Sequence, residues 1–447
     1  MPRRSDDTIF ACATAAGRAG IAVVRVSGPR AAAALSALGT TAGPARQLVR
    51  RRFRDKESGE LIDQGLAAWF PAPATFTGED LVELHLHGSA AVLSALIDLL
   101  GRLPGFRLAE PGEFSRRAFE NGKLDLTEAE AIADLVAADT AAQRRQALRQ
   151  LAGELGALYE GWRHRLLQSL ARQEALIDFP DEDLPETIPS AVFAEVNALI
   201  DEISGHLADN RRGERVREGL SIAILGPPNA GKSSLLNALA RREMAITSPV
   251  PGTTRDVIEA HLDLGGYAVT VSDTAGLRES GDAIEAEGVR RARARADQAD
   301  LRIMMVDASR PREADAPLRK LIGRDTVVVA NKIDLAADAG WADDLGGGPA
   351  RRLSLHTGAG LDALIDHLTR EVARRFDTAG APQITRARHR VALEDCLAAL
   401  RRSLAADLPE LAAEDLRLAT RSLGRITGRV DVEDMLDLIF REFCIGK

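Results

Sequence analysis

Cysteine is scarce in this chain of 447 residues: it has three, Cys12, Cys396 and Cys444, which lie far apart in the sequence. Three scattered thiols do not make the framework of a disulfide-stapled domain, and they are not spaced as zinc ligands. Such usage is typical of proteins in a reducing cytosol, so we expect a cytoplasmic location.

Long apolar runs are also missing. No stretch approaches the roughly 18 apolar residues that a membrane-spanning helix needs, so we expect no membrane segment. Two arginines near the start are followed by two aspartates rather than by an apolar core, which argues against a signal peptide. The ending Cys444-Ile445-Gly446-Lys447 has a cysteine placed as in a prenylation box. Gly446 is not aliphatic and no polybasic segment precedes the box, so we expect no lipid anchor.

Aromatic residues make up only 4% of the chain, while Ala, Leu and Arg are abundant, which favours helix. The formal net charge of -8 gives no overall attraction to nucleic acid, so any RNA contact requires a local basic patch. The basic stretches are residues 45–56 and 386–402. Composition alone favours a solvated face for each of them over a tRNA-binding groove.

The chain is too long for one ordinary domain. Residues 1–120 contain strand-like runs such as "GIAVVRVSG" and "LVELHLHG" and one helix-like run, "AAVLSALIDLL", which predicts an N-terminal α+β domain. Thr127 and Glu130 predict a capping box at the start of a helical region that continues to about Phe179. The run "VFAEVNALIDEISGHL" resumes the helical pattern after a break.

The sequence pattern changes again between residue 219 and about residue 376, where strands and helices alternate. The runs "LSIAIL", "AVTVSD", "LRIMMV" and "TVVVA" predict the central strands of a mostly parallel sheet with crossover helices. Helical patterning then returns to the end of the chain. We therefore expect a multidomain α/β protein: an N-terminal domain (1–120), a discontinuous helical-bundle domain (121–215 and 378–447, with a CIGK tail), and an inserted α/β domain (216–377).

Residues 226–233 fit GxxxxGKS between a predicted strand and a predicted helix. In this motif backbone N–H groups surround the phosphates, so Lys232 is expected to reach the β- and γ-phosphates and Ser233 to ligate Mg²⁺. The predicted phosphate-binding set also includes Asn229, Ala230, Gly231 and Ser234. A chance glycine-rich loop is the alternative, which the flanking elements and the downstream motifs disfavour.

Two further segments complete the expected metal and phosphate contacts. Thr254, in "PGTTRD", lies 21 residues after Ser233 and is placed to give Mg²⁺ a second hydroxyl. Asp273 follows a predicted strand and is expected to hold the metal through water, with the Gly276 N–H on the γ-phosphate. Thr274 and Ala275 belong to the same "DTAG" segment.

The segment "NKID" predicts the base specificity. An ionised Asp334 can accept two hydrogen bonds from the guanine edge, at roughly 1.5–3 kcal/mol each, whereas adenine presents the wrong donors. The expected base contacts also include Asn331 and Lys332 of this segment, and Ser354, Leu355 and His356 of "SLHTGAG". GTP rather than ATP is therefore the expected nucleotide, and the inserted domain (216–377) is expected to be a Ras-like P-loop G domain with a mostly parallel sheet.

The hydrolytic group is less evident, because many GTPases have a water-orienting glutamine where this chain has Leu277. Asn229 has a side-chain oxygen that could ligate a monovalent cation, and residues 247–253 could add backbone carbonyls; a loop-stabilising amide is the alternative. Glu285 could position water, although periodicity alone favours a solvent-facing carboxylate on a helix.

The motifs named above, together with "DTIFACATAAGRAGIAVVRVSG", "PGEFSRRAFENGKLDLTEAEAIADL", "DTAGLRES", "IEAEG" and the terminal "FCIGK", span the whole chain. In these the sequence resembles the tRNA-modification GTPase family MnmE (TrmE). The GTPase motifs are shared by many families, whereas the N-terminal blocks and the tail are far more specific.

This resemblance implies a homodimer in which K⁺ replaces an arginine finger. It implies that Asn229 is a K⁺ ligand, helped by backbone oxygens around Ser248, Val250 and Thr253, and that Glu285 orients the catalytic water. Leu277 is then no defect.

The same resemblance implies a site for a 5-formyl- or 5,10-methylene-tetrahydrofolate. The residues that match are Arg25, Glu83, Lys123 and Lys447, with Cys444 close by. From the residues alone, Arg25 and Glu83 could instead flank exposed strands and Lys123 could be solvated. His85 and His87 alternate along a strand, but without a cysteine or acidic cluster nearby we expect no metal there.

The function that the resemblance implies is K⁺-dependent GTP hydrolysis coupled to tRNA modification. With FAD-dependent MnmG, in a heterotetramer or larger assembly, such proteins add a (carboxymethyl)aminomethyl group to the wobble uridine. The alternative is a ribosome-associated or regulatory GTPase without modification chemistry, which would not need Arg25, Glu83, Lys123 or the CIGK tail. An ATP-using kinase is disfavoured by Asn331 and Asp334.

Overall fold

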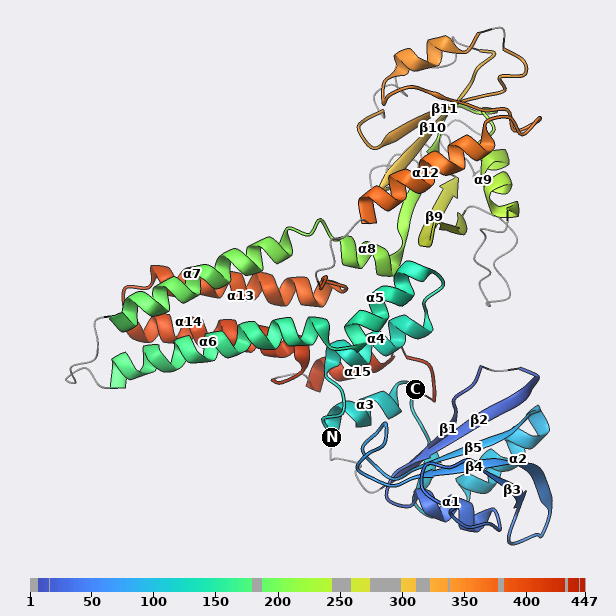
Figure 1. Ribbon diagram of the computed structural model, residues 1–447, viewed down its shortest axis with the longest axis vertical. Helices are drawn as coiled ribbons and strands as arrows, with labels where there is room; N and C mark the ends of the chain where they lie inside the picture. The colour runs from blue at the N-terminus through green and yellow to red at the C-terminus, as the bar shows by residue number, and fades with distance from the viewer. Residues whose placement is uncertain are drawn as a thin grey trace, which may run out of the picture. The chain divides into compact units, whose positions relative to one another are not determined.

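The computed structural model describes residues 7–15, 17–178, 187–242, 259–273, 299–310, 322–336, 338–376, 382–430, 433–441 and 443–446. The chain divides into two compact units (Figure 1). The first unit comprises Met1–Val136, Gln150–Asp201 and Ala392–Lys447, and the second comprises Ala137–Arg149 and Glu202–Val391. Each unit contains one sheet.

The sheet of the first unit has the strand order β3-β4-β5-β2-β1-β6 within the described residues. Neighbouring strands are antiparallel except β1 and β6, which are parallel. The strands are β1 (Thr8–Cys12), β2 (Ala19–Ser27), β3 (Val49–Arg54), β4 (Leu61–Phe70), β5 (Leu81–Gly88) and β6 (Phe106–Leu108).

Helices α1 (Ala31–Ala37) and α2 (Ala90–Gly101) contribute to the core on one face of this sheet. The alternating residues Val24 and Val26 of β2, and Leu84 of β5, are buried there. They pack in one cluster with Leu35 of α1 and Leu96 of α2. Because side chains alternate along a strand, the residues between them point to the opposite face.

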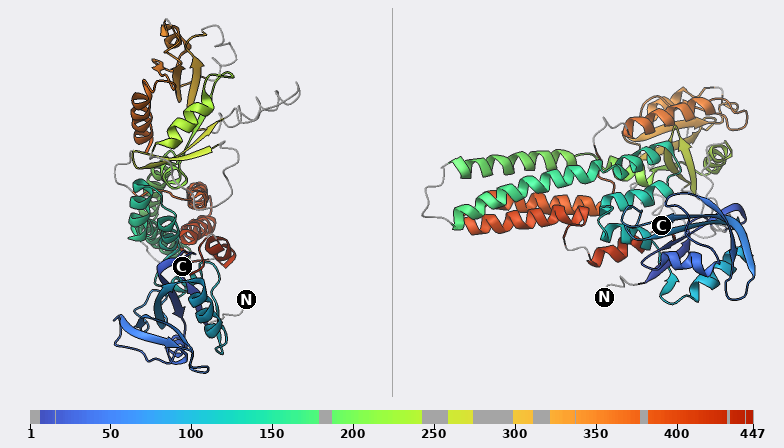
Figure 2. Two further views of the ribbon diagram at one scale, coloured as in Figure 1. Left: turned by 90° about the vertical axis from the view of Figure 1, so that its right-hand side faces the viewer. Right: turned by 60° about the horizontal axis from the view of Figure 1, so that its bottom comes forward.

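Further helices of the chain are α3 (Glu113–Glu120), α4 (Leu126–Val136), α5 (Ala141–Leu151), α6 (Glu154–Asp178), α7 (Thr187–Leu207), α13 (Ala387–Ala405), α14 (Pro409–Thr427) and α15 (Glu433–Arg441). Helices α6, α7, α13 and α14 run side by side in Figure 1 and in the right-hand view of Figure 2. Phe440 and Phe443, from α15 and just after it, pack against Leu126 and Ala129 of α4.

The capping box predicted at Thr127 and Glu130 lies two residues earlier, at Asp125 and Glu128. Helix α4 begins at Leu126, and Asp125 precedes it. The Asp125 carboxylate accepts a hydrogen bond from the Glu128 N–H (2.8 Å), and Glu128 accepts one from the Asp125 N–H (2.7 Å). This reciprocal pair satisfies N–H groups at the start of the helix, as a capping box does.

The sheet of the second unit has the order β12-β11-β10-β7-β9-β8. Its strands are β7 (Leu220–Leu225), β8 (Glu259–Leu264), β9 (Tyr267–Asp273), β10 (Leu301–Asp307), β11 (Thr326–Asn331) and β12 (Arg351–Arg352). All neighbouring strands are parallel except β8 and β9. The four strands predicted from the sequence are the four interior ones, which confirms a mostly parallel sheet.

Both faces of the central strand β10 are buried. Ile303 and Met305 lie in the cluster that contains Leu236 of α9 (Lys232–Arg241) and Leu364 of α12 (Leu361–Phe376). Met304 lies in a second cluster with the short helix η2 (Gly340–Leu345). A short helix, α8 (Arg212–Glu218), leads into β7. Among the described residues, every helix is too short or too polar to span a membrane.

The two basic stretches fall on different elements. Residues 45–56 include β3, which is an edge strand. Residues 386–402 lie mostly in α13, where Arg390 pairs with Asp209 (2.8 Å) and Glu214 (3.4 Å). The charge of Arg390 is therefore matched within the second unit.

Candidate functional site

The loop between β7 and α9 lies against two neighbouring strands. At Gly226 (φ 146°) an added Cβ would lie 2.1 Å from the Met305 carbonyl oxygen, and at Gly231 (φ 104°) it would lie 2.4 Å from Asn331 Nδ2. A side chain at either position would therefore collide with the ends of β10 and β11. The glycines of the motif are required by this close approach and by the left-handed backbone.

Lys232 reaches back over this loop. Its Nζ donates to the carbonyl oxygens of Gly226 (2.9 Å) and Pro227 (2.8 Å), and the side chain is buried. Burial lowers the pKa of Lys232, and the nearby charge of Asp273 opposes that shift. The ammonium is thus held where backbone N–H groups of the loop and the helix N-terminus also favour an anion.

Ser233 and Asp273 lie together at the carboxyl ends of two adjacent parallel strands. The Ser233 hydroxyl donates to Asp273 Oδ2 at 2.5 Å. Asp273 is the last residue of β9 and is 3% exposed. A hydroxyl and a carboxylate are the oxygen ligands that Mg²⁺ takes beside a phosphate.

Asn331 links the phosphate loop to the loop that follows β12. Its side-chain Nδ2 donates to the Ala230 carbonyl oxygen (2.8 Å), and its Oδ1 accepts from the Leu355 N–H (3.2 Å). The residue is 3% exposed, so both bonds are sheltered from water. One amide therefore joins the loop before α9 to the loop after β12.

Two side chains of the loop after β12 lie beside the Asp334 carboxylate. Ser354, fully buried, donates its hydroxyl to Asp334 Oδ1, and His356 Nδ1 lies 4.0 Å from Oδ2. The Ser354 hydrogen bond is the largest cause of a lowered pKa for Asp334. The carboxylate therefore stays ionised at neutral pH, as recognition of two guanine donors requires.

Asp307 is a residue of this site that the sequence analysis missed. It ends β10 and accepts a bond from Lys332 Nζ at 2.7 Å and from the Ser309 hydroxyl at 2.6 Å. Burial alone would raise the pKa of Asp307, but Lys332 and Ser309 together bring it below its usual value. A carboxylate directly after a buried parallel strand was the available signal, since such strand ends meet at one edge of the sheet.

In the first unit, Arg25 and Glu83 lie directly opposite each other on β2 and β5. Arg25 Nε donates to Glu83 Oε1 at 3.0 Å, and the Arg25 guanidinium lies 5.9 Å from the centre of the Phe76 ring. The two charged side chains are 29% and 20% exposed, so they are accessible to a ligand.

The two histidines of β5 each lie beside a single carboxylate. His85 Nε2 lies 3.6 Å from Glu83, and His87 Nδ1 lies 2.9 Å from Asp63. Within the described ranges, no three or more His, Cys, Asp or Glu side chains gather as a metal site would require.

The C-terminal tail lies against the N-terminal strands. Ile445 forms an isolated antiparallel bridge with Pro111, and an added Cβ at Gly446 would lie 2.3 Å from the Cys12 carbonyl oxygen. Cys444 is exposed. The tail is therefore anchored at the end of β1, in the same unit as Arg25 and Lys123.

Several of the predicted site residues lie outside the described residues. These are Ser248, Val250, Thr253, Thr254, Thr274, Ala275, Gly276, Glu285 and Lys447. The described ones fall into two groups, one around the phosphate loop in the second unit and one around Arg25 in the first. Asn229, exposed in the phosphate loop, and Ser234, in the first turn of α9, belong to the former.

Two family models match the chain. The model described as "MnmE helical domain" matches residues 126–444, and the one described as "GTP-binding protein TrmE N-terminus" matches residues 8–123. The chain belongs to the MnmE family.

Curated relatives from the MnmE family align along essentially the whole chain. The tRNA modification GTPase MnmE of Parvibaculum lavamentivorans is 57% identical over 99% of this chain and 100% of its own length. The proteins of that name from Paramagnetospirillum magneticum and Rhodospirillum rubrum are 58% and 55% identical; each alignment covers 99% of this chain, and 100% and 99% of the relative, respectively. Among solved structures, the G domain of the T. maritima FeoB iron transporter matches 34% of this chain and 98% of its own at 27% identity, with a TM-score of 0.27 that is too low to support an argument.

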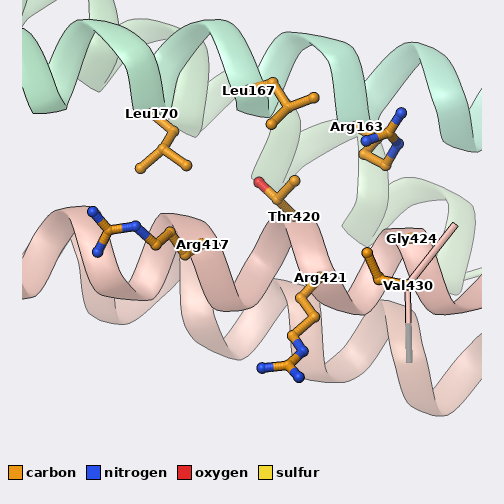
Figure 3. Close-up of a pocket in the computed structure, with 8 residues that line it drawn as sticks. All are labelled: Arg163, Leu167, Leu170, Arg417, Thr420, Arg421, Gly424 and Val430. Atoms are coloured by element: carbon orange, nitrogen blue, oxygen red, sulfur yellow. The ribbon is translucent and has the colours of Figure 1, made fainter.

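The span that matches the MnmE helical domain contains a cavity of about 380 Å³ between α6 and α14 (Figure 3). Its lining consists of Arg163, Leu167, Leu170, Arg417, Thr420, Arg421, Gly424 and Val430. Arg417 pairs with Glu174 at 2.8 Å and Arg163 with Glu160 at 2.9 Å, so these charges are already matched. None of the residues predicted from the sequence lines the cavity.

Replacing Ser233 by Ala is expected to weaken Mg²⁺-dependent GTP binding about tenfold, the equivalent of about 1.4 kcal/mol for one lost ligand. Titration of a fluorescent GTP analogue with and without Mg²⁺ measures this change. Asn237→Ala, on the exposed side of α9 one turn later, is the matched control and should bind as the unmodified protein does. Equal Mg²⁺ dependence in both variants would contradict the metal assignment of Ser233.

Proposed function

We propose that this chain is a K⁺-dependent GTPase that modifies the wobble uridine of tRNAs together with an FAD-dependent partner, MnmG. The added group is a (carboxymethyl)aminomethyl group whose carbon comes from a tetrahydrofolate. The observation that carries the GTP-binding part is the Asn331 amide, which joins the phosphate loop at Ala230 to the loop at Leu355. The names of the full-length relatives support the tRNA part.

In the proposed nucleotide site, Lys232 and the loop N–H groups bind the phosphates, while Ser233, Thr254 and Asp273 hold Mg²⁺. Asp334, together with Asn331, Lys332 and residues 354–356, binds guanine. The short contact between Ser233 and Asp273 fits two groups that share one cation.

The proposed K⁺ site comprises Asn229 and backbone oxygens around Ser248, Val250 and Thr253. Asn229 fits such a site because its side chain is exposed beside the phosphate loop and offers a neutral amide oxygen, the kind of donor that replaces the hydration shell of K⁺. Bound K⁺ would supply the positive charge that an arginine finger supplies in other GTPases. Glu285 is the proposed water-orienting residue.

The proposed folate site comprises Arg25, Glu83, Lys123 and Lys447. A basic residue of this set can pair with the glutamate carboxylates of the ligand, and Glu83 can accept hydrogen bonds from the N–H groups of the pterin. The partly exposed Arg25–Glu83 pair fits this use, since a ligand can reach both side chains without unfolding the strands.

We further propose a cytoplasmic homodimer that joins the partner in a heterotetramer or larger assembly. Its domains are the four predicted segments, 1–120, 121–215, 216–377 and 378–447. The three free cysteines suit such a location.

Nucleoside analysis of tRNA from a strain that lacks this gene tests the proposal. The (carboxymethyl)aminomethyl group should disappear from wobble uridine, and the gene supplied on a plasmid should restore it. An unchanged nucleoside profile would favour a regulatory GTPase without modification chemistry. Binding of 5-formyltetrahydrofolate to the full chain separates the two functions independently, because a purely regulatory GTPase has no use for it.

A further inference from the structure

One loop contacts two of the residues in the proposed folate site. Residues 75–79, between β4 and β5, place Phe76 with its ring centre 5.9 Å from the guanidinium carbon of Arg25. Two residues further, a Cβ added to Gly78 would lie 3.3 Å from Lys123 Cε. Arg25 belongs to β2 and Lys123 follows α3, so this loop, which we call the 75–79 loop, joins two distant parts of the sequence.

The 75–79 loop is partly exposed and is anchored by hydrogen bonds. Thr77 is fully buried; its hydroxyl lies 2.7 Å from that of Ser27, and its carbonyl oxygen accepts from Asn121 Nδ2 at 2.7 Å. The Thr75 hydroxyl donates to the Glu79 carbonyl oxygen at 2.6 Å. These bonds tie the loop to β2 and to the residue that follows α3, so they restrain its position.

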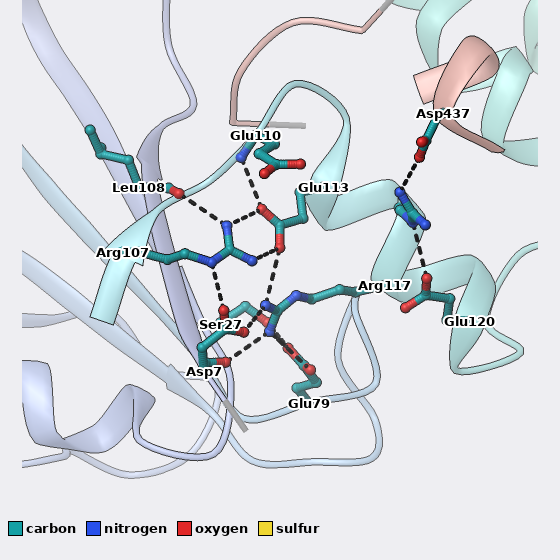
Figure 4. A network of polar contacts seen from close by, with 11 residues as sticks. Asp7, Ser27, Glu79, Arg107, Leu108, Glu110, Glu113, Arg117, Glu120 and Asp437 are labelled. Carbon is teal, nitrogen blue, oxygen red and sulfur yellow. Dashed lines mark hydrogen bonds and ion pairs between the residues drawn. The ribbon is translucent and has the colours of Figure 1, made fainter. Parts of the chain in front are cut away.

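Glu79 ties the loop to β2 and to α3 (Figure 4). Its Oε2 accepts from the Ser27 hydroxyl at 2.8 Å, and both carboxylate oxygens lie 3.2 Å from Arg117 Nη1. The Arg117 side chain is only 8% exposed and also pairs with Asp7 (2.7 Å) and Glu113 (3.1 Å). A buried charge held by several partners resists displacement, because any lost partner leaves it uncompensated.

Phe76 contacts both the core of the first unit and Arg25, whose guanidinium carbon lies over its ring. It packs against the buried residues Ile9, Ala11 and Phe114 and is itself only partly buried. Aromatic faces stack favourably on flat rings and on guanidinium groups. The 75–79 loop therefore places the Phe76 ring beside Arg25, a residue of the proposed folate site.

We infer that Phe76 offers its ring to the flat pterin of the folate and that Glu79 and Arg117 are positioning residues that hold the 75–79 loop for it. The inference rests on the proposed folate site and adds to it residues outside Arg25, Glu83, Lys123 and Lys447. Because the network lies wholly in the first unit, loss of the positioning pair should change folate affinity and leave GTP affinity unchanged.

Calorimetric titration of the full chain with 5-formyltetrahydrofolate tests the inference. Glu79→Gln and Arg117→Lys should each weaken folate binding about tenfold, and Phe76→Leu, which keeps apolar volume but removes the ring, about threefold to tenfold. Arg107→Lys is the matched control. Arg107 belongs to the same ionic network, through Asp7 and Glu113, but within the described residues it makes no hydrogen bond to the 75–79 loop. The Arg107→Lys variant should therefore bind folate within about twofold of the unmodified chain.

Melting temperature and GTP affinity are measured on every variant. Arg117→Lys and Arg107→Lys should both lower the melting temperature, and only the former should weaken folate binding. If Arg117→Lys does not fold, Thr77→Val against Thr77→Ser makes the same comparison: the serine keeps the hydroxyl that contacts Ser27, and the valine removes it.

Normal folate binding by Glu79→Gln and Arg117→Lys, or an equal loss in Arg107→Lys, would overturn the inference and leave the proposed function intact. Absence of binding by the unmodified chain is a different result. It would remove the folate part of the proposed function, and the inference with it.

Discussion

Exchanging KCl for NaCl at equal ionic strength is expected to slow single-turnover GTP hydrolysis by this chain about 10³-fold or more. An arginine finger contributes roughly 10³–10⁵ to the rate in other GTPases, and here its charge is proposed to come from K⁺. Leu277 stands where many GTPases have a glutamine, and its side chain cannot form a hydrogen bond with the attacking water. The rate is measured by quenched-flow at saturating protein.

The Asn229→Gly variant separates the effect of the proposed K⁺ ligand on hydrolysis from its effect on GTP binding. Asn229 has a φ of 62°, which glycine adopts without strain, so the substitution removes the amide and keeps the loop conformation. Its hydrolysis should be slow in both salts, while its GTP affinity stays within about threefold of the unmodified chain. Equal rates in KCl and NaCl for the unmodified chain would exclude the K⁺ proposal.

The four interior strands of the second unit were predictable because their signals are local. Strands buried on both faces are nearly continuous apolar runs, as Ile303–Val306 of β10 is. The glycine positions of the phosphate loop follow from one spacing rule. The edge strands β8 and β12 were not found. The first, with His261 and Asp263 among its six residues, has a solvated side, and the second is two residues long, so neither has a clear apolar pattern.

The first unit was predictable only in outline, since its contacts join residues far apart in the sequence. β3 contains four arginines, so the sequence analysis treated this segment only as a basic stretch and did not predict a strand. Its Phe53 is nevertheless fully buried. The Glu79–Arg117 pair joins a loop to a helix 38 residues later in the sequence. No sequence motif or periodicity relates two residues at that separation, so the pair could not be predicted. The capping box at Asp125 was misplaced for a simpler reason: Thr127, two residues later, also fits the Ncap preference.

Asp334→Asn is expected to change the base preference of the site from guanine to xanthine. The ionised Asp334 can accept from both donors of the guanine edge, whereas an asparagine turns one of those acceptors into a donor that faces the guanine amino group. Two charge-assisted bonds of roughly 1.5–3 kcal/mol each are affected, so GTP affinity should fall about 10²-fold or more. Xanthosine triphosphate has a carbonyl in place of that amino group and should gain affinity by a similar factor.

Competition between the two nucleotides for a fluorescent GDP analogue measures the exchange. Asp338→Asn is the matched control: Asp338 is an exposed carboxylate four residues later that accepts the Gly340 N–H at 2.8 Å, and its loss should leave both affinities unchanged. The factor by which Asp334→Asn weakens GTP binding should stay level from pH 8 to about 5, because the Ser354 hydrogen bond keeps the pKa of Asp334 below its usual value of about 3.9. If Asp334→Asn bound GTP normally and rejected xanthosine triphosphate, Asp334 would not be the residue that reads the base.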